Sequence, residues 1–240
     1  RQVETAFLPM YQLSYFPNNQ NVNGVQAYDK EVDALNQHTK ADKVYIVCSK
    51  EQLDENGSMK IFSMIDKLSA ELSVASDNET RKRLLMRRAI AHSVLRDFEA
   101  AISDFTYYIS LDDKNSLAYW QRAVCQAEMD EFNKAEGKGV LNIHSAEADF
   151  SDAIRLNSNN AYIYYNRGNL HAGRNELSKA IDDYTIALRI DNRLAEAYYN
   201  RGIARAKSGN KQTAIQDLSK AGELGLYDAY SVIKRLNKSK

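Results

Sequence analysis

This chain of 240 residues contains few prolines and few cysteines, and it has no net charge. The two prolines, Pro9 and Pro17, lie near its start, so the rest of the chain lacks the strongest helix breaker. The two cysteines, Cys48 and Cys125, are too few for a disulfide framework or a cysteine-based metal site. Both have apolar neighbours, which favours buried free thiols. No run of about 18 apolar residues occurs, so no transmembrane segment is expected.

The balance of charges bears on the class of partner. Lys plus Arg and Asp plus Glu each number 32, so the formal net charge is zero. A balanced charge argues against the broad basic surface that binds nucleic acid or anionic lipid. We therefore expect a protein or peptide partner rather than nucleic acid, and self-association is possible.

An internal repeat organises most of the chain. The pentapeptide YYNRG occurs at residues 164–168 and again at 198–202, which is a period of 34 residues. Small and aromatic residues follow both copies at the same offsets, and such a period is typical of repeat proteins. With the glycine of YYNRG as position 8, the frame divides residues 82–228 into four units. These units are 82–115, 116–160 with an 11-residue insertion, 161–194 and 195–228.

Each unit reads as two amphipathic helices joined by a turn. In the third unit Tyr164, Gly168 and His171 mark one helical face, and Ala180, Tyr184 and Ala187 follow at helical spacing. This pattern resembles the tetratricopeptide repeat, although Arg replaces the usual Leu at position 7 and the usual Pro at position 32 is missing. The resemblance implies a mainly α fold. It would be a right-handed superhelical stack of helix-turn-helix repeats, whose first helices line a concave face.

The Arg at position 7 has an acidic counterpart. Every unit carries Asp at position 23, and positions 7 and 23 lie at the same height in an antiparallel helix pair. We expect a structural Arg–Asp pair in each repeat; a row of Arg residues that binds an anionic ligand is the alternative. The pairs are Arg88–Asp104, Arg122–Asp149, Arg167–Asp183 and Arg201–Asp217.

The insertion in the second unit predicts a protruding loop near residues 134–145. Three extra helical turns would accommodate 11 residues equally well. Two glycines, Gly137 and Gly139, argue against a continuous helix. We expect the apolar residues of the loop to fold back on the repeat or to meet a partner. These residues are Val140, Leu141 and Ile143.

Residues 1–80 do not follow the repeat. The order of patterns in this segment predicts a small α/β unit, or irregular structure. The expected elements are an extended FLPMYQLSYFP, a helix from about Gly24 to Asn36, a strand at KVYIVCS and a helix from near Ser58. Alternatively, the first sixteen residues belong to an upstream domain. Seven of the eleven residues in FLPMYQLSYFP are Phe, Leu, Met or Tyr, so this segment should be ordered. It could lie in the chain's own sheet, in its repeat groove or on a neighbouring molecule.

The end of the chain, residues 229–240, is expected to be a capping helix. Open-ended repeat stacks need such a helix to cover the last apolar surface. Its expected apolar face carries Tyr230, Ile233 and Leu236.

No constellation of residues points to catalysis, a metal or a cofactor. The sequence contains no zinc-protease, phosphate-loop or nucleophile-elbow motif. Its four histidines are scattered, and two of them fall at position 11, a core site of the repeat. Structural histidines are therefore favoured over metal ligands. They are His38, His92, His144 and His171.

The resemblance implies a non-enzymatic scaffold that binds a protein segment in the concave groove. Aromatic residues at position 5 would supply contact area, and amides at positions 6 and 9 would hold backbone groups. The carboxylate clamp of some tetratricopeptide proteins is absent. Two alternatives are a spacer within a longer repeat protein, whose position-5 aromatics pack between helices, and an accessory domain of an enzyme complex. The expected partner-binding residues are Trp120, Tyr162, Tyr165, Asn166, Asn169, Tyr199 and Asn200.

The many Asn and Tyr residues resemble repeat proteins of Bacteroides-like bacteria, several of which are exported. This resemblance favours the cell envelope or periplasm, with the cytoplasm as the alternative. The chain begins at Arg1 without an initiator Met, which indicates a processed or excised chain.

Overall fold

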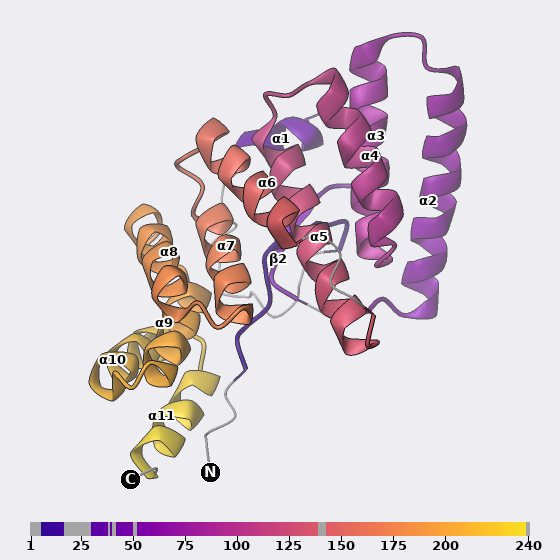
Figure 1. Ribbon diagram of the computed structural model, residues 1–240. Helices are drawn as coiled ribbons and strands as arrows, with labels where there is room; N and C mark the ends of the chain where they lie inside the picture. Colours follow the sequence, from indigo (N-terminus) through magenta and orange to yellow (C-terminus); the bar gives the residue numbers. More distant parts are fainter. Residues whose placement is uncertain are drawn as a thin grey trace. The chain divides into compact units, whose positions relative to one another are not determined.

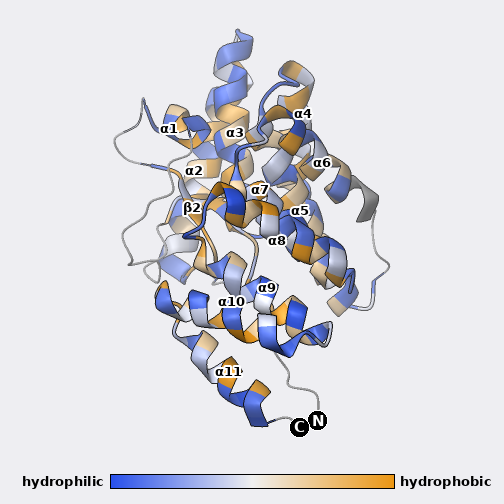
Figure 2. Cartoon of the chain, turned by 90° about the vertical axis from the view of Figure 1, so that its left-hand side faces the viewer, coloured by the Kyte–Doolittle hydropathy of each residue, from blue (hydrophilic) through white to orange (hydrophobic). Residues whose placement is uncertain are grey.

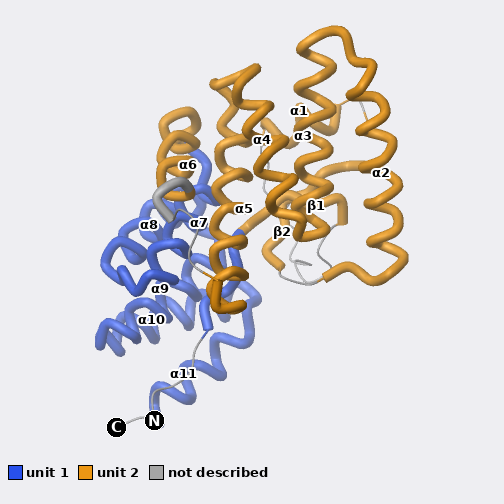
Figure 3. The backbone as a smooth tube through the Cα atoms, turned by 45° about the vertical axis from the view of Figure 1, so that its right-hand side comes forward, with its two compact units in different colours: residues 1–10, 159–240 blue, residues 11–158 orange. Residues whose placement is uncertain are grey.

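The computed structural model describes residues 6–16, 30–37, 39, 42–49, 52–138 and 143–238. The described residues form eleven α-helices and two short strands, so the fold is mainly helical as the repeat pattern predicted (Figure 1). The chain divides into two compact units, one of residues 11–158 and the other of residues 1–10 and 159–240 (Figure 3).

The unit of residues 11–158 begins with the small α/β segment. Its elements are β1 (Gln12–Ser14), α1 (Lys30–Asn36), β2 (Tyr45–Val47) and α2 (Glu55–Val74). The strands pair antiparallel, with Leu13 opposite Ile46. The strand–helix–strand–helix order agrees with the sequence pattern, although residues 24–29 of the first expected helix lie outside the described residues. Helix α2 starts before Ser58 because Asp54 caps it, accepting a hydrogen bond of 2.7 Å from the Gly57 N–H.

The remaining helices pack in pairs. In the same unit they are α3 (Asn78–Val94), α4 (Phe98–Leu111), α5 (Ser116–Ala135) and α6 (Ile143–Leu156). In the other unit they are α7 (Ala161–Gly173), α8 (Leu177–Ile190), α9 (Ala195–Lys207), α10 (Lys211–Glu223) and α11 (Asp228–Lys238). Each first helix packs on the second helix of its own repeat, and α4 packs on α5 as α8 packs on α9. This arrangement is a stack of helix-turn-helix repeats.

The turn between the two helices has the same backbone geometry in three repeats. Position 15 is left-handed, with φ of 62° at Arg96, 62° at Asn175 and 83° at Gly209. Position 15 donates its N–H to the carbonyl of position 12, and position 16 donates to that of position 11, at 2.9–3.1 Å. The left-handed conformation costs Gly little and other residues more. The geometry is therefore kept by the hydrogen bonds even where the residue does not favour it.

The insertion lengthens both a helix and a connection. Helix α5 has 20 residues whereas α7 has 13, so seven of the inserted residues extend the helix. The others lie in the connection to α6, where Gly137 has a φ of 69° that ends the helix. The expected loop at 134–145 was therefore too wide, because Ala135 and Ile143 belong to helices. Val140 and Leu141 lie outside the described residues, as does the side chain of Ile143.

A bidentate Arg–Asp ion pair lies in every repeat. The guanidinium donates through Nε and Nη2 to both carboxylate oxygens, at 2.7 Å in the first two repeats and 2.8–2.9 Å in the last two. Each Asp is buried, and in three repeats the guanidinium also lies over the Tyr ring of position 4. The Nη1 of Arg122 donates to Thr106, and that of Arg201 to Thr185, each in the preceding repeat. The pair therefore joins the two helices of each repeat, and the Nη1 bonds of Arg122 and Arg201 also join two successive repeats.

The last helix, α11, covers the end of the stack with a face that includes two of the three expected residues, Ile233 and Leu236. Ala229 and Val232 are buried, with Ile233 and Leu236 partly buried beside them, at helical spacing. Tyr230 is 47% exposed because it stands at the edge of this face, where its ring lies against Gly222. Hydrophobic and hydrophilic residues alternate along α11 in Figure 2.

We predict that the Arg–Asp pairs stabilise the fold unequally. Replacing Arg122 with Leu leaves the buried Asp149 without its bidentate partner and should lower the free energy of unfolding by roughly 3 kcal/mol. Replacing Arg201 with Leu should cost less, because Asp217 still accepts from Arg205 at 2.7 Å. Urea denaturation of the two variants measures the difference. An Arg122→Leu chain as stable as the wild type would show that the pair adds no stability.

A second prediction concerns the close approach of α7 and α8. A Cβ at Gly168 would lie 2.8 Å from Cε1 of Tyr184, whereas a Cβ at Gly173 would have no atom within 4 Å. Gly168→Ala should therefore lower the free energy of unfolding by about 1–3 kcal/mol. Gly173→Ala, in the same helix, is the control and should be neutral or stabilising by up to about 1 kcal/mol. Equal thermal stability of the two variants would contradict the close approach.

Candidate functional site

The backbone of Leu8 is held by side chains of the last two repeats. The Leu8 N–H donates to Oδ1 of Asn200 at 2.8 Å. The Leu8 carbonyl accepts from Nδ2 of Asn169 at 2.9 Å and from Nδ2 of Asn200 at 3.1 Å. The hydroxyl of Tyr165 donates to the next carbonyl, that of Pro9, at 3.0 Å. We call Tyr165, Asn169 and Asn200 the amide site.

The amide site is oriented by bonds among its own members. Nδ2 of Asn200 also donates to the Tyr165 hydroxyl and to Oδ1 of Asn169, both at 2.9 Å. Tyr184, from α8, donates to the same Oδ1 of Asn169 at 2.7 Å. Burial raises the pKa of the Tyr184 hydroxyl, so it stays protonated and remains a donor. These bonds among the side chains fix their orientation at the Leu8 backbone.

Apolar contacts flank the hydrogen bonds. Phe7 and Leu8 pack against a buried cluster at the end of the stack, and Nζ of Lys207 lies 5.3 Å from the centroid of the Phe7 ring. The cluster consists of Tyr199, Ile203, Leu218, Ala221, Ala229 and Val232. The segment that begins at Phe7 is therefore ordered against the protein, and its binding site is in the repeats.

In the unit of residues 11–158, β1 packs on the first helices α3 and α5. The Leu13 N–H donates to Oε1 of Gln121, the position-6 residue of its repeat, at 3.0 Å. The Tyr15 hydroxyl donates to the Arg87 carbonyl at 2.7 Å, and burial raises its pKa. Position 6 thus supplies an amide to an extended backbone in both units, through Gln121 in one and Asn200 in the other.

Every expected partner-binding residue except the half-buried Asn169 is buried. Trp120, Tyr165 and Asn166 are fully buried, and Tyr162 and Tyr199 are nearly so. Tyr199 belongs to the apolar cluster beneath α11, whereas Tyr165 packs beside Tyr184 with ring centroids 5.7 Å apart. The position-5 aromatics Trp120, Tyr165 and Tyr199 therefore pack within the fold, and the Tyr165 hydroxyl also donates to the Pro9 carbonyl.

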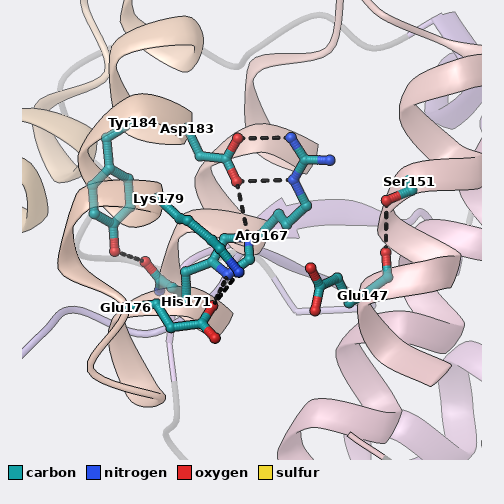
Figure 4. Close-up of polar contacts among 9 residues, drawn as sticks. Glu147, Ser151, Arg167, His171, Glu176, Lys179, Asp183 and Tyr184 are labelled. Atoms are coloured by element: carbon teal, nitrogen blue, oxygen red, sulfur yellow. Dashed lines mark hydrogen bonds and ion pairs between the residues drawn. The ribbon is translucent and has the colours of Figure 1, made fainter. Parts of the chain in front are cut away.

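Two histidines have equivalent places in their repeats. At position 11, His92 pairs through Nδ1 with Asp97 at 3.1 Å, and His171 with Glu176 at 2.7 Å, each partner being at position 16. His171 is buried, and Nε2 of its ring lies 3.7 Å from Asp183 (Figure 4). His38 and the side chain of His144 lie outside the described residues. Both described histidines thus tie the turn of a repeat to its first helix.

The described part of the chain contains no group of three or more His, Cys, Asp or Glu side chains that could hold a metal ion. None of the described helices is long and apolar enough to cross a membrane. Burial raises the pKa of the Cys125 thiol to about 12, so it is protonated, whereas Cys48 is only partly buried.

Comparison with known proteins identifies the fold. Residues 172–209 match the sequence profile of the TPR repeat family, and no curated protein matches the chain. A crystal structure of MamA is 21% identical, with a TM-score of 0.60, and the match covers 75% of this chain and 99% of MamA. MamA 41-end from Desulfovibrio magneticus RS-1 is 16% identical, with a TM-score of 0.56, and the match covers 82% and 97%.

A third similar structure is that of YrrB, described as a TPR protein with an unusual peptide-binding site. It is 16% identical, with a TM-score of 0.57, and the match covers 75% of this chain and 86% of YrrB. At these identities the solved structures show the fold alone, which is a stack of tetratricopeptide repeats. The comparisons do not support the bacterial group that the composition suggested.

We predict a pH dependence for the turn of the third repeat. The hydrogen bond from His171, followed by that from Lys179, lowers the pKa of the Glu176 carboxyl. A carboxyl whose pKa is lowered by folding stabilises the fold at pH values above its pKa in the unfolded chain. This stability is lost as the pH falls through its pKa in the folded state. Glu176→Gln should therefore be less stable than the wild type at pH 7.

The two chains should converge in stability as the pH falls below about 4, near the unfolded pKa of Glu. Thermal unfolding between pH 7 and pH 3 measures this convergence. Lys179→Met is the control, and it should reduce the pH dependence less because Lys179 is the smaller cause. A constant difference between Glu176→Gln and the wild type over this range would contradict the prediction.

Proposed function

We propose that this protein, whose fold is a tetratricopeptide-repeat stack, is a non-enzymatic scaffold that binds an extended segment of a protein partner at the amide site. The observation that carries the proposal is the pairing of Leu8, whose N–H and carbonyl are both held by side chains of two repeats. Tetratricopeptide repeats generally mediate interactions between proteins, in agreement with this role.

The chemistry of the amide site suits a polypeptide backbone. An amide side chain donates and accepts at once, so Asn200 can satisfy both polar groups of one peptide residue. The guanidinium of position 7 in both repeats is already paired with Asp183 or Asp217. The site therefore presents neutral donors and acceptors, which favour an internal segment of a protein over an acidic chain terminus.

A spacer role is the second candidate, and the burial of the position-5 aromatics favours it. Trp120 and Tyr165 are fully buried, so they contribute to packing whatever the partner. In that case residues 7–9 would be a permanent part of the fold, and the amide site would bind no other protein. An accessory role in an enzyme complex would use other surfaces.

A peptide array distinguishes these candidates. We expect the chain, probed at high concentration, to bind a subset of extended apolar peptides, and an Asn169→Ala/Asn200→Ala chain to lose that subset. Asn210→Ala is the matched control, because Asn210 is exposed and should keep the whole subset. Circular dichroism establishes that all three chains are folded.

A Phe7→Ser/Leu8→Ser chain, which we call the segment variant, is probed in parallel because it weakens the internal contacts of residues 7–9. The proposed function fails if neither the wild type nor the segment variant binds any peptide. It also fails if the Asn169→Ala/Asn200→Ala chain, once folded, binds the same subset as the wild type.

A further inference from the structure

We infer that the amide site selects an aromatic–Leu–Pro sequence in extended conformation, and that residues 7–9 are an internal ligand which a partner carrying such a sequence displaces. This inference rests on the proposed function and adds to it the chemical class of the partner. It comes from three features of the segment: the backbone of Leu8, the missing N–H of Pro9 and the apolar side chains of Phe7 and Leu8.

The first feature is the position of the hydrogen bonds. The Leu8 carbonyl lies within hydrogen-bond distance of three donors, the third being the Tyr165 hydroxyl at 3.4 Å. The Leu8 N–H has a buried acceptor, Oδ1 of Asn200. The site therefore binds the backbone at this residue position, and the residue there must have an N–H.

The second feature is the proline that follows. Both amide oxygens of the site are already engaged, because Oδ1 of Asn200 accepts from the Leu8 N–H and Oδ1 of Asn169 accepts from Tyr184 and from Asn200. Proline at this place has no N–H that would need an acceptor. Proline also confines the preceding residue to extended conformations, so Leu8 loses less entropy when it is bound. Its carbonyl remains useful, since the Tyr165 hydroxyl donates to it.

The third feature is the apolar surface on either side. Phe7 and Leu8 lie against the cluster that contains Tyr199 and Ile203. The ammonium of Lys207 lies over the Phe7 ring, which favours an aromatic residue over an aliphatic one at this place. Together the three features define the recognised sequence as an aromatic residue followed by Leu and Pro.

The internal ligand competes with any partner. A segment tethered to its site acts at an effective concentration in the millimolar range for a short flexible connection. An outside peptide with the same three residues therefore binds the wild type weakly, and weakening the internal contacts should reveal its full affinity. A natural partner must add contacts beyond these three residues.

The test uses two fluorescent peptides, AFLPMY, which copies residues 6–11, and AFLAMY, which lacks the proline. The segment variant should bind AFLPMY at least about tenfold more tightly than the wild type does, as expected when a tethered competitor is weakened. It should also bind AFLPMY more tightly than AFLAMY. Adding Asn200→Ala to the segment variant should abolish binding, while adding Asn210→Ala should not.

A second measurement keeps the test informative if the segment variant does not fold. Millimolar AFLPMY added to the wild type should move the NMR signal of the Leu8 amide toward its random-coil position, because the free peptide replaces residues 7–9. An unmoved Leu8 signal at saturating peptide would overturn the inference.

Other outcomes would also overturn it. Equal affinity of the wild type and the segment variant would mean that residues 7–9 do not compete, and equal affinity for AFLPMY and AFLAMY would mean that proline is not selected. A wild-type dimer that disappears in the segment variant would assign the site to residues 7–9 of a second copy. If array peptides without this sequence bind through Asn200, the inference fails while the proposed function stands.

Discussion

The bidentate bond between Arg at position 7 and Asp at position 23 is the constraint on which the repeats depend. It holds the two helices of one repeat together and, through Nη1 of Arg122 and Arg201, reaches a hydroxyl of the preceding repeat. The guanidinium is bonded to a buried Asp in every repeat, which favours a structural role over binding of an anionic ligand. In the proposed function, recognition falls to the neighbouring positions of the same helix, where amides occur.

Those amides give the protein its distinctive site. Asn169 and Asn200 come from successive repeats, and their side chains converge on one carbonyl, that of Leu8. The convergence depends on the packing of α7 and α9 and on the hydroxyl groups of Tyr165 and Tyr184, which complete the hydrogen bonds. The site is therefore a product of the stack, and no single repeat could form it.

The sequence predicted the repeated features and missed those that occur once. The spacing of YYNRG predicts the mainly helical stack, and α7 and α9 begin at the first residues of the units in that frame. The sequence could not predict how the 11 inserted residues divide between helix α5 and the connection to α6. A glycine indicates that a helix is interrupted, but it does not show how far the helix before it extends. In α11, the prediction placed Tyr230 on the buried face because its side chain is large. The structure buries the smaller Ala229 instead, because Ala229 lies on the helical face that packs on the stack.

The residues that contact the N-terminal segment could not be predicted from the sequence either. Its composition indicates that it is ordered, and its alternating pattern suggests a strand. Leu8 and Asn200 are separated by 192 residues, and no local pattern links them. The position-5 aromatics show the same limit, because a large ring suits a binding surface and a core equally well.

Hydrogen exchange at the Leu8 amide tests the central claim most directly. We expect this N–H to exchange far more slowly than a random-coil amide in the wild type and in Asn210→Ala, and to lose that protection in Asn200→Ala while the amides of α7 keep theirs. Random-coil exchange of the Leu8 amide in the wild type would contradict it.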